Sequence, residues 1–238
     1  MESATNHSPA LILTPMNRQL HMGWGHREAG DAAERGDLLV VVDVLRFTSA
    51  ATTAAAHGAI VRPLEWTWGA AVGTKSPVHY IEAEVSKIYD VSSPNGAMCC
   101  RHGGEVLAGS LLNAAATAAE AMQLASAEGT DVTVLACGER WHDTRKLRFA
   151  LEDYLGAGAI LSHMRGSATM SADAELCARA FDAAGADLER LVRECPSGRE
   201  LVEWGKGSDV DHACRLDLYD VAVVKRDGLL VPASGSSA

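Results

Sequence analysis

Aromatic residues are scarce in this chain, and the usual sequence signs of a transition-metal centre are absent. Phe, Trp and Tyr together make up 5% of the 238 residues. The six cysteines include no C-x-x-C pair, and the nine histidines show no H-x-H or H-x-x-x-H spacing. These absences argue against a zinc site and against a redox dithiol.

Long apolar runs and basic charge are also lacking. No stretch approaches the roughly 18 consecutive apolar residues of a membrane span. The first residues, Met1 to His7, lack the basic and apolar regions of a secretory signal. Lys and Arg number 21 against 31 Asp and Glu, which gives a formal net charge of -10. We therefore expect a cytoplasmic protein with no membrane and no nucleic-acid partner, in which an anionic ligand would need local arginines.

The apolar residues that are present predict a layered fold. Five of them, Leu38 to Val42, indicate a strand buried on both faces, as at the centre of a parallel sheet. Other strands are predicted at residues 10–13, 59–64, 78–81, 131–136, 221–224 and 229–231, and helices at 48–56, 105–127, 147–161 and 171–184. This alternation predicts an α/β fold, a three-layer α/β/α arrangement with a largely parallel or mixed central sheet. We expect one domain over residues 10–232, with flexible termini at 1–9 and 233–238.

The strand at Leu38 to Val42 ends on charged residues. Asp43 follows it directly, and Arg46 lies at the start of the next helix. Ligands of open α/β sheets bind beyond the carboxyl ends of the strands. Asp43 could simply cap the helix, but Arg46 opposes the helix dipole unless an anion binds there. Phosphatases with an aspartate nucleophile carry a second Asp two residues later, and Leu45 disfavours that class.

The turn Ser93-Pro94-Asn95-Gly96 is a second candidate site. Pro fixes φ, and Asn and Gly tolerate positive φ, so this is strong turn chemistry. Hydroxyl groups and free backbone N–H groups before a helix can hold an anion. An ordinary tight turn is the alternative interpretation. The stretch Gly73 to Ser76 is only superficially similar to a phosphate loop, because its Lys is misplaced and no strand leads into it.

Charged residues also follow the strand predicted at residues 131–136. Glu139 and Arg140 stand at its carboxyl end, where a ligand is expected. Arg199 lies in the first turn of a predicted helix, where the dipole favours an anion rather than a cation. Both arginines are therefore consistent with an anionic ligand.

Three polar residues lie within predicted helices. Glu152 and Asp153 are adjacent and point about 100° apart, so we expect at most one of them to face a site. Asn113 is unfavourable in the middle of a helix and either reaches a loop or a ligand or faces solvent. Small residues at 156–159 would allow the helix to approach the sheet closely.

Six motifs occur in one order along the chain. They are D-V-L-R-F-T-S from Asp43, S-P-N-G from Ser93, G-S-L-L-N-A from Gly109, A-C-G-E-R-W from Ala136, L-E-D-Y-L-G-A-G-A from Leu151 and S-G-R-E-L from Ser197. Together they resemble the successive motifs of the 2-phosphosulfolactate phosphatase family over roughly residues 21–232. The resemblance implies a magnesium-dependent phosphatase of α/β/α fold that removes phosphate from 2-phospho-3-sulfolactate.

One segment departs from the pattern of many family members. Residues 66–90 contain no Gly-Phe-Asp-x-Gly-Asn-Ser-Pro stretch, a lack that a shorter branch of the family shares. The missing acidic residues could hold the metal or recognise the sulfonate. The sequence therefore leaves open a related small phosphate monoester as substrate.

The resemblance also suggests roles for the candidate acidic residues. Mg²⁺ prefers carboxylate oxygens, so Asp43 with Glu139 or Glu152 is the expected ligand set. Asp43 and Glu139 are also candidate catalytic groups, and whether Asp43 binds metal or forms a phospho-enzyme is left open.

The remaining candidates are expected to bind the substrate. Arg46, Arg140 and Arg199 would clamp its anionic groups, and Arg46 is also a candidate catalytic residue. The turn would cradle one anionic group through Ser93, Asn95 and Gly96, and Asn113 would add a further contact. The alternative is a non-catalytic small-anion-binding protein derived from the phosphatase fold. The Ala-rich helices could supply the close-packed face of a homodimer.

Overall fold

The computed structural model describes residues 18–67 and 70–233 of the protein. Its strands are β1 (Gln19–Trp24), β2 (Leu38–Val42), β3 (Ile60–Leu64), β4 (Ile88–Ser92), β5 (Val106–Gly109), β6 (Val132–Ala136), β7 (Glu139–Arg140), β8 (Leu147–Arg148), β9 (Thr169–Met170), β10 (Val223–Arg226) and β11 (Leu229–Pro232). The helices are α1 (Gly25–Arg35), α2 (Phe47–Ala56), α3 (Gly96–Cys99), α4 (Ala114–Glu128), α5 (Leu151–His163), α6 (Ala172–Ala184), α7 (Leu188–Glu194), α8 (Pro196–Glu203) and α9 (Gly207–Ala213). Three short 3₁₀ helices occupy Pro77–Glu82, Leu111–Asn113 and Gly185–Asp187.

A mixed sheet forms the centre of the described structure. Its nine strands run in the order β4-β3-β11-β10-β5-β2-β6-β1-β9. The five strands β5, β2, β6, β1 and β9 are parallel to one another. At the other edge, β3 and β4 form a parallel pair. The antiparallel β10–β11 hairpin lies between these two groups and pairs antiparallel with β5 and with β3. The predicted α/β fold with a mostly parallel central sheet is therefore confirmed.

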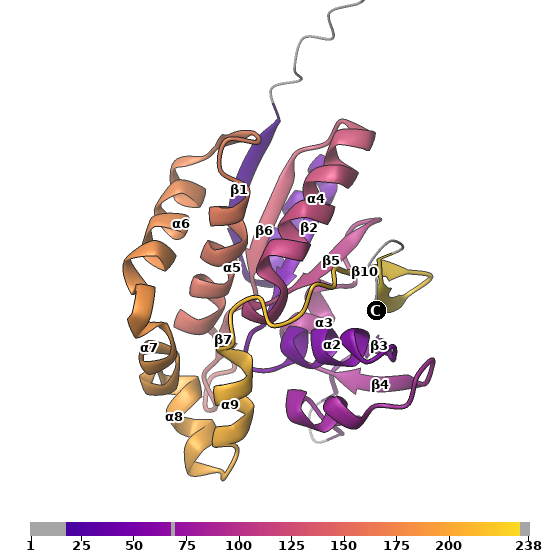
Figure 1. The fold of residues 1–238 in the computed structure, drawn as a ribbon, viewed down its shortest axis with the longest axis vertical. Coiled ribbons are helices and arrows are strands. Elements are labelled where there is room, and N and C mark those ends of the chain that lie inside the picture. Colours follow the sequence, from indigo (N-terminus) through magenta and orange to yellow (C-terminus); the bar gives the residue numbers. More distant parts are fainter. Residues whose placement is uncertain (1–17, 68–69, 234–238) are drawn as a thin grey trace, which may run out of the picture.

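Helices cover both faces of this sheet. Side chains of α4, α5 and α6 pack in one apolar cluster, and those of α1, α2 and α3 pack in another on the opposite face. In Figure 1, α5 and α6 lie side by side, and α7, α8 and α9 follow below α6 in the view. Every residue of β2 is buried, as a strand covered on both faces requires.

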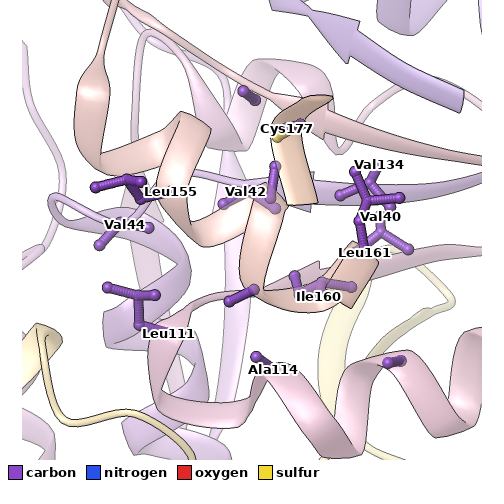
Figure 2. Packing of buried hydrophobic residues seen from close by; sticks show 14 of the residues in the cluster. Val40, Val42, Val44, Leu111, Ala114, Val134, Leu155, Ile160, Leu161 and Cys177 are labelled. Carbon is purple, nitrogen blue, oxygen red and sulfur yellow. The ribbon is translucent and has the colours of Figure 1, made fainter. Parts of the chain in front are cut away.

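The cluster on the α5 face shows how this strand is held. Val40 and Val42 of β2 pack with Leu155 and Ile160 of α5 (Figure 2). The helix approaches closely at Gly156, where an added Cβ would lie 2.6 Å from Val44 Cγ2. This confirms the expected close approach of small residues to the sheet. Burying one such aliphatic side chain contributes roughly 1.5–3 kcal/mol.

Several predicted elements differ from the observed ones. The helix expected at residues 105–127 begins only at Ala114, because residues 106–109 form β5 between β2 and β10. A short apolar run has no periodicity that separates a buried strand from a helix. The strand expected at 78–81 is a 3₁₀ helix, and β4 was not expected. Of the predicted termini only Ala233 is described, and it is buried with its N–H donating to Ala222 O.

No helix in the described part of the chain is long and apolar enough to cross a membrane. The predicted strand at 10–13 and the start of the predicted domain lie outside the described residues. The predicted homodimer stays a prediction.

Candidate active site

Asp43 directly follows β2, and its carboxylate contacts the turn that follows β4. Asp43 Oδ2 accepts hydrogen bonds from Ser93 Oγ at 3.0 Å and from Gly96 N at 2.9 Å. Its Oδ1 accepts from Phe47 N at 3.3 Å. The side chain is 5% exposed. Asp43 therefore joins two segments that are fifty residues apart in the sequence.

The contact between Asp43 and the turn depends on a glycine. A Cβ added at Gly96 would lie 2.7 Å from Asp43 Oδ2 and 2.5 Å from Phe47 Cδ1, closer than real Cβ contacts. Only a residue without a side chain lets the backbone N–H approach the carboxylate. The Pro-Asn-Gly sequence thus serves a close contact as well as a turn.

The same turn also reaches the end of β6. Asn95 Nδ2 donates to Glu139 Oε1 at 2.8 Å, and the following backbone N–H, that of Arg140, donates to the same oxygen at 2.7 Å. Asn95 is 6% exposed, and its Oδ1 has no hydrogen-bond partner among the described residues. The structure therefore brings together Asp43, the turn and Glu139 from three predicted motifs.

Asp153 is a functional candidate that the sequence pattern did not single out. Its Oδ1 accepts from Val44 N at 2.8 Å and its Oδ2 accepts from Gly138 N at 2.9 Å, so it ties the loop after β2 to the loop after β6. Burial, together with the nearby negative charges of Asp43 and Glu152, raises the pKa of Asp153 well above its ordinary value. Both acidic residues of this pair are buried, Glu152 at 2% and Asp153 at 3% exposed, and neither is among the residues that line the two cavities described below.

A cavity of about 270 Å³ opens beside these loops. Four cationic side chains line it: Arg46, Lys75, Arg140 and Arg145. The acidic residues among its lining are Glu139 and Glu200. The protein as a whole carries an excess of ten negative charges. A local excess of cations in such a chain indicates a site for an anionic ligand.

Contacts within the protein fix two of these cations. Arg46 forms an ion pair with Asp209, which is 1% exposed and also accepts from Ser76 Oγ. Arg140 Nη1 donates to the backbone oxygen of Arg145 at 3.1 Å. The guanidinium groups are thus held in position by α9 and by the β7–β8 hairpin.

A second cavity of about 260 Å³ adjoins the first. The two share four lining residues, namely Trp66, Pro94, Arg140 and Arg145. The second cavity adds His26 and Met98. His26 Nε2 lies 2.9 Å from His102 Nε2, and burial and the neighbouring His102 lower the pKa of His26. The arginines therefore stand where the two cavities meet.

Asn113 and Arg199 are not among the residues that line these cavities. Asn113 is fully buried, where its Oδ1 accepts from Ser110 N at 2.9 Å and its Nδ2 donates to Val221 O at 3.0 Å. These bonds hold the end of β5 to the segment before β10. The substrate contact expected of Asn113 is therefore corrected, because its side chain is buried and connects two parts of the fold. Arg199 is exposed and is not part of either lining.

Glu152 lies under the cavity wall and not in the cavity. Its Oε2 accepts from Cys195 Sγ at 3.2 Å. Burial raises its pKa, while hydrogen bonds from Ser197 and Cys195 and the charge of Arg148 act in the opposite direction. Ser197 itself lines the cavity.

The three expected metal ligands do not gather into one site. In residues 18–67 and 70–233 no group of three or more His, Cys, Asp or Glu side chains is placed to hold a metal ion. Asp43 faces the turn, Glu152 faces Cys195, and Glu139 alone of the three lines the cavity. The predicted set of Asp43, Glu139 and Glu152 therefore does not fit a preformed Mg²⁺ site.

The fold and the cavity define an α/β protein with a cavity lined by cationic side chains beyond the carboxyl ends of its central strands. Comparison with known families identifies the family, because residues 73–228 match the one described as 2-phosphosulpholactate phosphatase. The chain belongs to this family.

Two curated relatives have the same description. A probable 2-phosphosulfolactate phosphatase of Gloeobacter violaceus is 29% identical over 211 residues, which cover 76% of this chain and 85% of the relative. Another, from Symbiobacterium thermophilum, is 29% identical over 232 residues, covering 82% of this chain and 94% of the relative.

Proposed function

We propose that the protein is a phosphatase that hydrolyses 2-phosphosulfolactate or a related small anionic phosphate monoester to the 2-hydroxy acid and phosphate. Family membership supports the reaction class. The observation that carries the substrate class is the cavity with four cationic side chains beside Glu139. A substrate with a phosphate and other anionic groups needs this excess of positive charge.

The cations would bind and orient the substrate. Arg46, Arg140 and Arg145 present guanidinium groups suited to planar oxyanions, and Lys75 adds a compact charge. Their charge favours the transition state as negative charge shifts towards the leaving oxygen. Because Asp209 holds Arg46, this group needs little reorganisation when the substrate binds.

Glu139 is the carboxylate best placed to accept a proton from the attacking water. It lines the cavity, and two donors hold its Oε1, which fixes the orientation of the carboxylate. Asp43 is not among the residues that line the cavity, and three donors engage its carboxylate. We assign Asp43 the positioning of the turn, and Glu139 the role of general base.

A dependence on Mg²⁺ is part of this proposal. Mg²⁺ commonly binds through one or two carboxylates together with substrate phosphate oxygens. A smaller donor set fits this requirement: Glu139 in the cavity, and the adjoining buried Asn95 Oδ1 that lacks a partner among the described residues. A cation bound there would neutralise charge on the phosphate.

The alternative is a non-catalytic protein that binds small anions. The observation in its favour is that the three expected metal ligands do not converge within the described residues. It predicts binding of phosphate esters without release of phosphate.

A panel of phosphate esters separates these possibilities. 2-Phosphosulfolactate, phosphoglycolate and phospholactate would be incubated with the protein after EDTA treatment and again after addition of Mg²⁺. We expect phosphate release from at least one ester, and higher release with Mg²⁺. Binding of the esters without any release would support the anion-binding alternative. Equal release with EDTA and with Mg²⁺ would contradict the metal dependence alone.

A further inference from the structure

Tryptophan is concentrated at the cationic cavity. Three of the five tryptophans of the chain, Trp66, Trp141 and Trp204, line it. Trp141 is 55% and Trp204 59% exposed. In a chain with only 5% aromatic residues this is an unusual concentration. Large apolar side chains left exposed around a hollow commonly mark a binding surface.

The three indoles come from separate segments of the chain. Trp66 follows β3, Trp141 lies in the β7–β8 hairpin, and Trp204 follows α8. No single secondary structure element accounts for their meeting. Their convergence is a property of the cavity and not of local sequence composition.

Cations accompany two of these rings. Lys75 Nζ lies 5.6 Å from the centroid of Trp66, and the Arg148 guanidinium carbon lies 5.8 Å from that of Trp141. The wall therefore presents flat apolar surface and positive charge together. A ligand that matches it combines an anionic group with a flat apolar group.

The sulfonate of 2-phosphosulfolactate does not match the apolar part of this wall. That substrate carries phosphate, carboxylate and sulfonate on three carbons and has no apolar face. The four cations would suit it, but the indoles of Trp141 and Trp204 would gain no apolar contact. Covering exposed aromatic surface favours binding, and such a substrate would forgo that contribution.

Two cavities meet at the cationic residues. The first cavity measures about 270 Å³, and the adjoining one about 260 Å³. Arg140 and Arg145 border both cavities, so one anionic group can bind at the junction while the rest of the ligand extends along Trp66 or Met98.

We propose that the phosphate monoester preferred by this site carries an aromatic or similarly flat apolar group where 2-phosphosulfolactate carries its sulfonate. This inference rests on the proposed phosphatase function and specifies its substrate class. In the reaction, the oxygen of water bonds to phosphorus and the bond from phosphorus to the C2 oxygen breaks. The C2 oxygen gains a proton, which leaves the 2-hydroxy acid and inorganic phosphate.

A matched pair of substrates tests this inference. 2-Phospho-3-phenyllactate keeps the carboxylate and phosphate of 2-phosphosulfolactate and replaces the sulfonate with a phenyl ring. We expect kcat/KM for the phenyl ester to exceed that for the sulfonate ester. Hydrolysis of the sulfonate ester with little or no hydrolysis of the phenyl ester would overturn the inference and leave the proposed function intact.

Tryptophan variants test whether the indoles cause the expected preference for the phenyl ester over the sulfonate ester. Trp204→Leu and Trp141→Leu keep an apolar side chain but remove the ring. Each change should lower the ratio of the two kcat/KM values by roughly twofold to twelvefold, which corresponds to the about 0.5–1.5 kcal/mol that an aromatic pair contributes beyond its buried area. Phe149→Leu changes an aromatic residue that is 57% exposed and outside the cavity lining, and should leave the ratio unchanged. An unchanged ratio in both tryptophan variants would overturn the inference.

A binding measurement keeps the inference testable if neither ester is hydrolysed. That outcome would contradict the proposed function, and tryptophan fluorescence would then be titrated with both esters. Tighter binding of the phenyl ester, lost in Trp204→Leu, would support the inference. Equal or weaker binding of the phenyl ester would overturn it.

Discussion

Asp43 and Gly96 are joined by a hydrogen bond of 2.9 Å between the Asp43 carboxylate and the Gly96 backbone N–H. This bond fixes the turn after β4 against the end of β2. Asn95 of the same turn donates a hydrogen bond to Glu139, the carboxylate that lines the cavity. The geometry of the proposed general base therefore depends on a contact that is itself outside the cavity.

Replacing Asp43 by Asn should reduce phosphatase turnover at least tenfold. An amide has one acceptor oxygen, whereas Asp43 receives three donors, so at least one buried donor loses its partner. Losing a hydrogen bond to a buried charged group costs about 1.5–3 kcal/mol. The measurements are the phosphate release rate and the free energy of unfolding. A turnover near that of wild type would contradict the positioning role of Asp43.

Replacing Gly96 by Ala should shift the turn and lower both activity and stability. The new methyl group would lie 2.5 Å from Phe47 Cδ1 and 2.7 Å from Asp43 Oδ2. Forcing a methyl group into a packed site typically costs about 1–3 kcal/mol. Gly104→Ala is the control, since a Cβ there meets nothing within 4 Å. The two variants would be compared by urea unfolding and phosphate release, and equal behaviour would show that the close approach is unimportant.

Asp153→Asn should change how stability depends on pH. The folded state raises the pKa of Asp153, so it binds this proton more tightly than the unfolded chain does. The stabilising contribution is complete below the ordinary Asp pKa of about 3.9 and is lost as pH rises through the higher folded-state value. The advantage of wild type over the variant in free energy of unfolding should therefore shrink as pH rises above about 4.

Asp182→Asn is the control, because the pKa of Asp182 is shifted in the opposite direction and its effect on stability should have the opposite dependence on pH. A hydrogen bond from Arg165 lowers the pKa of Asp182, a residue near the surface. Its contribution is present above the ordinary pKa and is lost as pH falls through the lower folded-state value. Urea unfolding at several pH values checks both variants. Parallel pH profiles for wild type and Asp153→Asn would contradict the raised pKa of Asp153.

Arg140→Gln should raise KM for an anionic ester roughly tenfold or more, because a charged hydrogen-bond donor contributes about 1.5–3 kcal/mol. Arg140 borders both cavities, where a bound anion would meet it. Arg165→Gln, which removes an exposed charge paired with Asp182, should leave KM unchanged. Steady-state kinetics at low and moderate salt provides the test, since salt screens such contacts. Similar KM values for both variants would contradict binding at the cationic cavity.

Local patterns predicted some elements correctly and others not. The five apolar residues from Leu38 to Val42 can be buried on both faces only as a central strand, and they are. The run Val106 to Gly109 is equally apolar, and its surroundings in the sequence predict a helix. It forms a strand because it pairs with β2 and with β10 of the C-terminal hairpin. Strand pairing between distant segments leaves no mark on local periodicity.

The candidate site was also predictable only in part, because local sequence patterns do not record contacts between distant segments. Asp43, Glu139 and the turn follow strands or strong turn residues, so their positions could be read from the sequence. The inward direction of Asp153 could not, because two adjacent helical residues are both buried only when other segments cover both directions. Lys75 and Arg145 lie in loops without any periodic signal, and only the structure places them at the cavity.

By itself the sequence determined the α/β class, the central strand β2 and the chemistry at its end, because burial patterns and turn residues act over a few neighbouring positions. The tertiary structure decided what those residues contact. It turned the Asp43 carboxylate onto Gly96 and buried Glu152 against Cys195. It also gathered three tryptophans around four cations. Such contacts join residues far apart in the chain, and their geometry is fixed only when the sheet and its covering helices pack together.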